Sequence, residues 1–129
     1  MTIKNYIFQI QNAIYRTIKS SNINCDVIMN RGQSVVYPYI MISGTKKKEM
    51  DNSQKEFITE LNVLTKDFSV ISASSILEKL EGTITRQIIQ ENISYYSVNF
   101  AECTNSTVFT TDEGFFHGKI SITTILDEN

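Results

Sequence analysis

The side chains that could act as acids, bases, nucleophiles or metal ligands are few and scattered. His117 is the only histidine, and Cys25 and Cys103 are the only cysteines. A catalytic histidine needs a nucleophile and an orienting group, and no serine or cysteine motif accompanies this one. A zinc site needs more ligands than one histidine and two distant thiols supply. The sequence therefore predicts no enzyme, no metal site and no cofactor, and both cysteines are expected to be reduced and structural.

The only run of like charges is formed by Lys46, Lys47 and Lys48. Two interpretations stay open: a solvated hairpin tip, or an electrostatic contact with an acidic partner or with DNA phosphate. Glu49 and Asp51 follow at once and weaken the DNA interpretation. The net charge of -2 also argues against a protein that wraps nucleic acid, which normally carries a basic excess.

Length and composition indicate one ordinary globular domain spanning residues 1–129. The chain has 129 residues, of which 41% are hydrophobic and 20% charged. No apolar run approaches the roughly 20 residues that a membrane helix needs, and the first residues show no signal-peptide pattern. Unpaired thiols fit a reducing compartment, so we expect a cytosolic location without membrane contact.

Two segments carry the apolar spacing of a helix face, with repeats of three and four residues. The first predicts a helix from about Thr2 to Lys19. The second predicts a helix that Asp67 or Ser69 caps and that ends or bends at Gly82. The apolar positions of the two helices are Ile3, Ile7, Ile10, Ile14 and Ile18, and Val70, Ala73, Leu77, Leu80, Ile84 and Ile88.

Four segments are predicted to be the main strands, and a short strand is possible at residues 26–29. Pro38, the only proline, stands where a strand can begin, and the strand after it is apolar on both alternating faces. Two polar segments, 44–53 and 103–114, are expected to be loops that become ordered only on docking. The main strands are Tyr39 to Ser43, Lys55 to Thr65, Tyr96 to Ala101 and Phe116 to Ile125.

The order of these elements is helix, strand, strand, helix, strand, strand. It predicts an α+β fold in which two helices pack on one face of a mainly antiparallel sheet of about four strands. Ile40 and Ile42 would face the helices. His117, between Phe116 and Gly118, would lie on the outer face of its strand.

Three local signatures in this order resemble the tail-completion proteins of long-tailed bacteriophages, also called tail terminators or tail-to-head joining proteins. They are Val-Tyr-Pro-Tyr-Ile-Met-Ile at 36–42, Leu-Asn-Val-Leu-Thr-Lys-Asp at 61–67, and Asp-Glu-Gly-Phe-Phe-His-Gly-Lys-Ile-Ser-Ile at 112–122. The resemblance covers nearly the whole chain. The chain departs from the family pattern at Leu64 and Thr65, where a tryptophan is often found, and in residues 103–114, which lack the usual arginine.

This resemblance implies a structural virion protein at the junction of head and tail, assembled in the host cytoplasm. Such proteins form a hexameric ring that caps the tail tube, stops its polymerisation and offers a surface to the head connector. The family implies an α+β sandwich without cofactor or catalysis, and DNA passes only transiently through the ring. Two alternatives remain: a head-closure or neck protein of the same particle, or a small non-viral α+β ligand-binding domain.

A ring places specific demands on each subunit. Closed rings use head-to-tail interfaces, so every subunit carries two different adhesive surfaces. We expect Tyr39, Met41, Ile58 and Leu64 at the boundary between subunits, because they are apolar positions opposite the predicted core. Lys46–Lys48 would contact a partner or face the lumen. A ligand-binding domain would instead need a pocket with convergent polar groups.

Overall fold

The computed structural model describes residues 6–29, 35–48, 54–94 and 96–128. The described residues form three helices and five strands, in the order one helix, three strands, two helices and two strands. They are α1 (Tyr6–Lys19), β1 (Asp26–Ile28), β2 (Tyr39–Lys48), β3 (Lys55–Leu64), α2 (Ile71–Thr83), α3 (Arg86–Glu91), β4 (Tyr96–Thr110) and β5 (Phe116–Glu128).

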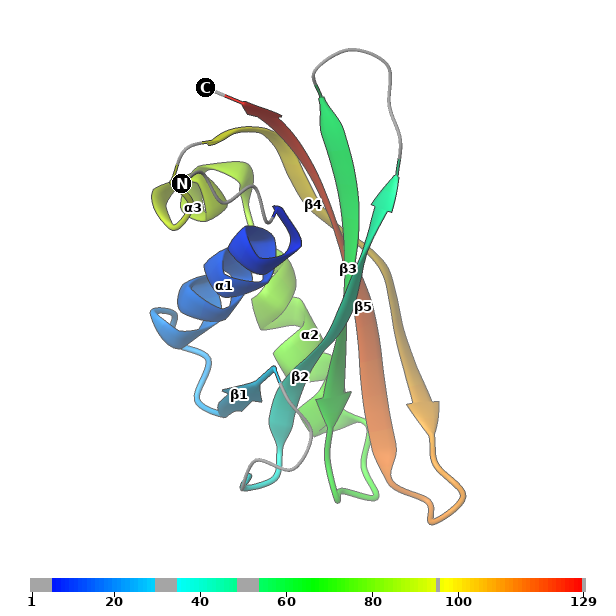
Figure 1. Cartoon of the computed structure of the whole chain (residues 1–129). Coiled ribbons are helices and arrows are strands. Elements are labelled where there is room, and N and C mark those ends of the chain that lie inside the picture. The colour runs from blue at the N-terminus through cyan, green and yellow to red at the C-terminus, as the bar shows by residue number, and fades with distance from the viewer. Residues whose placement is uncertain (1–5, 30–34, 49–53, 95, 129) are drawn as a thin grey trace.

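The five strands form one sheet in the order β1-β2-β3-β5-β4. β1 runs parallel to β2, and the other neighbours are antiparallel. All three helices pack on the same side of the sheet and leave the other side bare (Figure 1). The predicted α+β class is therefore confirmed. The fold has three helices where two were predicted, and the parallel strand β1 makes the sheet five-stranded and mixed.

The core lies between the helices and the covered face of the sheet. Ile10, Ile14 and Ile18 of α1 are buried, as their spacing predicts, whereas Ile7 is 37% exposed. Residues 1–5, which include Ile3 of the predicted stripe, lie outside the described part. From the sheet, the predicted core residues Ile40 and Ile42 are buried, and so are Phe57, Leu61, Val63, Ile120, Ile122 and Leu126.

The second predicted helix is two helices. α2 ends at Thr83, because Ile84 adopts an extended backbone with φ -83° and ψ 98°. Thr85 then starts α3: its Oγ1 accepts a hydrogen bond from the N–H of Ile88 at 3.3 Å. Such a side-chain cap satisfies one of the unpaired N–H groups at a helix start. The apolar spacing runs through the break because both helices bury residues against the same sheet.

The predicted cap of α2 is wrong in detail. Val70 occupies the N-cap position and makes no side-chain capping bond. Ser69 precedes it, and its Oγ accepts from the N–H of Ile71 at 3.3 Å. Asp67 uses its backbone instead: its carbonyl accepts from the N–H of Phe116 at 3.0 Å, which ties the β3–α2 connection to the start of β5.

The two segments predicted as loops are mostly strand. β2 continues to Lys48, and β4 continues to Thr110. The end of β2 extends past the helices (Figure 1), so the side chains of Lys46–Lys48 alternate between two exposed faces. In β4, Cys103 and Val108 pack against the core, but residues 105–107 between them are exposed and polar, so the segment shows no apolar period. Residues 49–53 of the first predicted loop lie outside the described part of the chain.

Candidate assembly surface

The bare face of the sheet holds all four residues predicted at a subunit boundary. Tyr39 pairs with Leu64, and Met41 pairs with Asn62. Side chains along a strand alternate between faces. Because Ile40 between them is buried under the helices, Tyr39 and Met41 point the opposite way.

Ile58 belongs to the same face. It pairs with Lys46 on β2 and with Thr123 on β5, and Thr123 pairs with Glu102 on β4. Ile58 is 39% exposed, between the fully buried Phe57 and Thr59. The register thus groups the four predicted residues on one unpartnered surface, which we call the bare face.

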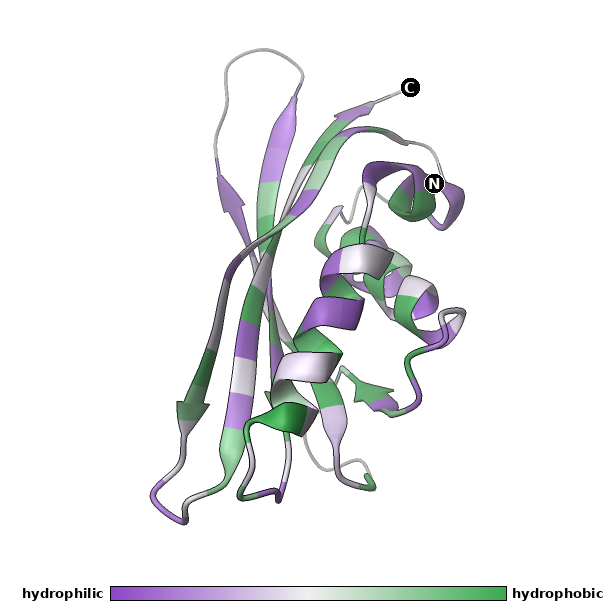
Figure 2. Cartoon of the chain, turned by 180° about the vertical axis from the view of Figure 1, so that it is seen from behind, coloured by the Kyte–Doolittle hydropathy of each residue, from purple (hydrophilic) through white to green (hydrophobic). Residues whose placement is uncertain are grey.

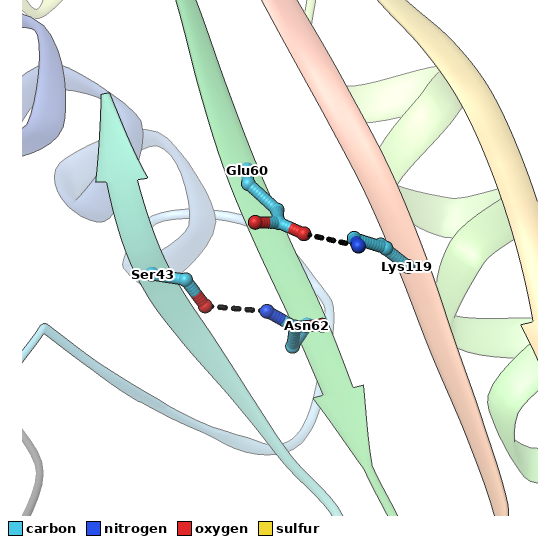
Figure 3. A network of polar contacts seen from close by, with 4 residues as sticks. All are labelled: Ser43, Glu60, Asn62 and Lys119. Atoms are coloured by element: carbon cyan, nitrogen blue, oxygen red, sulfur yellow. Dashed lines mark hydrogen bonds and ion pairs between the residues drawn. The ribbon is translucent and has the colours of Figure 1, made fainter. Parts of the chain in front are cut away.

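The centre of the bare face is polar (Figure 3). Lys119 Nζ lies 2.7 Å from Glu60 Oε1, and Asn62 Nδ2 donates to Ser43 Oγ. These contacts link β2, β3 and β5 across the sheet. An open hollow of about 550 Å³ covers this region, lined by Ser43, Gly44, Thr45, Lys46, Ile58, Glu60, Lys119 and Ser121.

This hollow holds few groups that could bind a small molecule. Of its polar side chains, Glu60 pairs with Lys119, and Ser43 accepts a hydrogen bond from Asn62. A ligand site normally encloses its ligand and directs unpaired polar groups at it. The hollow therefore resembles a polar, hydrated patch within a contact surface more closely than a ligand pocket.

The lysine run does not form a single cationic patch. Lys46 pairs with Ile58 and lies on the bare face, as does Lys48, which pairs with Glu56. Lys47 pairs with the buried Phe57 and therefore points to the other side. Lys48 Nζ is 3.5 Å from Glu56 Oε2. The run is a strand edge of alternating lysines and not the hairpin tip that its composition suggests.

His117 lies on the bare face, as predicted for the outer side of its strand. Its ring is 6.0 Å from the ring of Phe109, its partner on β4, in an edge-on arrangement. Within the described residues, no group of three or more histidine, cysteine or acidic side chains could hold a metal ion. No described helix is long and apolar enough to cross a membrane.

The two thiols are free and partly buried. Burial, together with the carboxylates of Glu81 and Glu102, raises the pKa of Cys103 to about 12. Burial also raises the pKa of Cys25, with Asp26 as the second cause. A reactive thiol requires the opposite, a lowered pKa. Both cysteines therefore have the character of structural residues.

A second surface lies at the end of the sheet where β2 begins and β3 ends. Phe68, at 73% exposed, stacks on Phe115 with ring centroids 5.0 Å apart. Ile71, the first residue of α2, is also 73% exposed. Lys66 Nζ lies 4.6 Å above the ring of Tyr37. We call Tyr37, Lys66, Phe68, Ile71 and Phe115 the apolar end.

Figure 2 shows this end from behind, with hydrophobic residues at the first turn of α2 and at the last residues of β4. The predicted site did not include it, because Phe68 and Ile71 belong neither to the predicted helix stripe nor to a predicted strand. The signal that could have identified it is the pair of aromatic residues beside turn-forming segments, Phe68 after Asp67 and Phe115 after Gly114.

Comparison with known proteins supports the fold alone. No family model matches the chain, and no curated protein matches it either. Among solved structures, it is similar to a chain in a structure described as the virion of a native gene transfer agent particle. The TM-score is 0.74 at 7% sequence identity, and the match covers 96% of each chain. The protein thus shares its fold, over 96% of its length, with a chain of that virion structure.

Proposed function

We propose that this protein is a structural virion protein that forms a ring, capping the tail tube, ending tail polymerisation and joining the tail to the head connector. The observation that carries the proposal is the fold shared with a virion chain over 96% of both chains. The three sequence signatures that resemble tail-completion proteins also support this role. The ring is a hexamer in this proposal, and the protein has no catalytic role.

The bare face supports assembly. The face carries Ile58, 39% exposed, and Tyr39, Met41 and Leu64 on the other side of its polar centre. Large apolar side chains on an uncovered sheet face suit a contact with another protein chain. Its polar centre, with the Lys119–Glu60 ion pair, resembles the mixed composition of protein interfaces. This face would meet neighbouring subunits or tail components.

The apolar end supports a second contact. In a ring, the ends of the strands face the neighbouring layers of the particle when the strands run along the ring axis. Phe68 and Ile71 are large and exposed, and the same end holds the Lys66 ammonium above the ring of Tyr37. Large exposed side chains of this kind are typical of interface anchors. The apolar end would contact the tail tube protein or the head connector, while DNA passes transiently through the ring.

Electron microscopy and native mass measurement of the purified chain test the proposal. We expect sixfold rings that bind to one end of tubes assembled from the tail tube protein of the same particle and stop their growth. A chain that remains monomeric at high concentration, alone and with tubes, would refute it.

The same experiment separates the alternatives. Rings that bind the head connector but leave tube growth unchanged would indicate a head-closure or neck protein. A monomer that is stabilised by a small molecule bound at the hollow would indicate a ligand-binding domain.

A further inference from the structure

The sheet has two open edges of unequal character. β1 pairs only with Tyr39–Met41, so no strand of the described residues lies on the outer side of the half of β2 from Gly44 to Lys48. β4 forms the opposite edge over its whole length, Tyr96–Thr110. An open edge presents unpaired N–H and C=O groups that can pair with another chain.

The first part of the β4 edge is covered from within the molecule. Gln90 of α3 donates from Nε2 to the carbonyl of Tyr96 at 3.0 Å, and its Oε1 accepts from the N–H of Val98 at 2.7 Å. Arg86 donates to the carbonyl of Val98 at 3.3 Å. These side chains take the place of a neighbouring strand. Within the described residues, no such cover continues along positions 100–110.

The uncovered part of β4 also lacks the residues that usually protect an edge. Natural edges are protected by lysine, proline, β-bulges or shortness. The register of β4 is irregular between Val98 and Phe100 and between Thr104 and Thr107, so Phe100–Thr104 is the regular part of its uncovered edge. Positions 100–110 contain no lysine and no proline, and Glu102 is their only charged residue. Phe100 and Phe109 are 39% and 45% exposed. This stretch is long, nearly uncharged and rich in β-branched and aromatic residues, which favours pairing with another strand.

The β2 edge has the complementary character. Lys46 and Lys48 lie there on the bare face, and Lys47 lies on the other side. The β2 edges of two copies would repel each other, since like charges opposite one another destabilise a strand pair. A β4 edge whose only charge is negative has no such conflict. The charges thus disfavour β2 pairing with β2 and favour β2 pairing with β4.

We propose that β4 of one copy pairs with the Gly44–Lys48 half of β2 in the next copy, so that the sheet continues from subunit to subunit around the ring. This inference rests on the ring of the proposed function. Three antiparallel pairings separate β2 from β4, so the two strands run in opposite directions within one sheet. A rotation about the ring axis keeps these directions, and the new pair is antiparallel.

The pairing places opposite charges on one face. Glu102 shares a cross-strand row with Thr123, Ile58 and Lys46, so Glu102 and the two lysines Lys46 and Lys48 all point to the bare face. In a continuous sheet, the Glu102 carboxylate of one copy would then face the lysines of the next. Opposite charges across such a pair contribute roughly 0.2–1 kcal/mol each.

Charge reversal with rescue tests the pairing on the full chain. One variant carries Glu102→Lys, a second carries Lys46→Glu with Lys48→Glu, and a third combines all three changes. We expect each of the first two to raise the protein concentration at half assembly at least tenfold, and the third to return it close to the wild-type value. Light scattering and native mass spectrometry measure the assembly.

Glu78→Lys and Lys79→Glu, on the exposed surface of α2, are matched controls that should leave assembly unchanged. Thermal unfolding followed by circular dichroism establishes that every variant is folded. The positions changed in β2 and β4 are all exposed, and among the described residues the only ion pair that the changes remove is the weak Lys48–Glu56 pair. The variants should therefore keep the fold.

Three outcomes would overturn the pairing. Rings that tolerate both reversals, or reversals that the combined variant does not rescue, would show that these edges do not meet, while the ring itself and the proposed function would stand. A wild-type dimer in place of a ring would indicate that β4 pairs with β4. A wild-type chain that is monomeric throughout would overturn both proposals together.

Discussion

Gly118 of β5 lies in close contact with Leu77 of α2. A Cβ placed at Gly118 would lie 2.9 Å from Leu77 Cδ1 and 3.1 Å from Leu77 Cγ. Leu77 is 3% exposed, so it has little space into which it could move. Glycine at this position therefore sets the distance between the helix layer and β5.

Gly118→Val tests this close contact. We expect the free energy of unfolding to fall by about 1–3 kcal/mol, because overpacking forces neighbouring side chains out of their rotamers. Urea unfolding measures it. Gly44→Val is the matched control, since a Cβ at Gly44 would meet nothing within 4 Å. A loss as large at Gly44 as at Gly118 would contradict the packing argument.

Cys103 makes the free energy of unfolding fall with rising pH in the alkaline range. Its pKa rises from 9.0 to about 12 in the fold, chiefly because burial disfavours the thiolate. The folded state therefore retains the thiol proton more strongly than the unfolded state. The contribution of Cys103 to the free energy of unfolding is complete below about pH 9 and is lost as the pH rises toward 12.

We expect the free energy of unfolding of the wild-type chain to fall more steeply above about pH 9 than that of a Cys103→Ala variant. Urea unfolding at a series of pH values measures the two slopes. Alkylation by iodoacetamide gives an independent readout, because Cys103 should react much more slowly in the folded chain than in urea. Parallel slopes for the two proteins would contradict the expectation.

At the scale of elements, α3 acts as a brace for the beginning of β4. It contains six residues, and Gln90 makes two of its contacts with backbone groups of the strand. A helix this short depends on tertiary contacts, because isolated helices of such length are marginal in water. The brace and the strand edge thus stabilise each other.

Gln90→Ala should lower the free energy of unfolding by about 1 kcal/mol, since it removes two hydrogen bonds at a partly buried site. It should also speed hydrogen exchange at the amide of Val98. Gln87→Ala on the same helix is the control, because Gln87 is exposed and neither of these bonds involves it. Equal effects of the two substitutions would show that α3 does not brace the strand through Gln90.

Elements with one buried face were predictable from the sequence. Ile10, Ile14 and Ile18 define α1 through their spacing, and Pro38 marks where β2 begins. The outer halves of β2 and β4 were not predictable in the same way. Lys46–Lys48 have no buried face to impose a period of two. Cys103–Thr110 bury only parts of Cys103 and Val108, and a register irregularity between Thr104 and Thr107 interrupts the alternation. The strand conformation of both segments depends on pairing with β3 and β5.

The candidate site was predictable only where it follows from alternation. Tyr39, Met41, Ile58 and Leu64 share the bare face because each neighbours a core position, which the sequence reveals. The apolar end joins segments that are distant along the chain, Phe68 and Phe115 among them, and only the folded structure brings them together. The parallel strand β1 was predicted as an element, but its partner depends on tertiary packing.

At the scale of the whole molecule, the apolar end predicts a contact separate from ring formation. Ile71→Ser should weaken binding to tubes or connector by tenfold or more, because a large apolar side chain that is 73% exposed becomes polar. Ring formation should persist. Sedimentation of the variant with preassembled tubes, and with connector, measures the binding.

Ile7→Ser is the control, since Ile7 is 37% exposed and belongs to α1, which contributes no residue to the apolar end. It should leave binding within about twofold of the wild-type value, as is usual for surface substitutions. Binding that survives Ile71→Ser unchanged to both partners would show that the apolar end has no role in docking.

The unequal edges of the sheet also determine how completely a ring would form. An arc of two, three or five subunits always leaves one β2 edge and one β4 edge open, whatever its length. Only closure removes both, and the closing contact forms within a single particle at a high effective concentration. Partial arcs would therefore be scarce at equilibrium, and titration would show monomers and complete rings with little between them. If the ring caps the tail as proposed, an all-or-none stop on tail growth would follow from that scarcity.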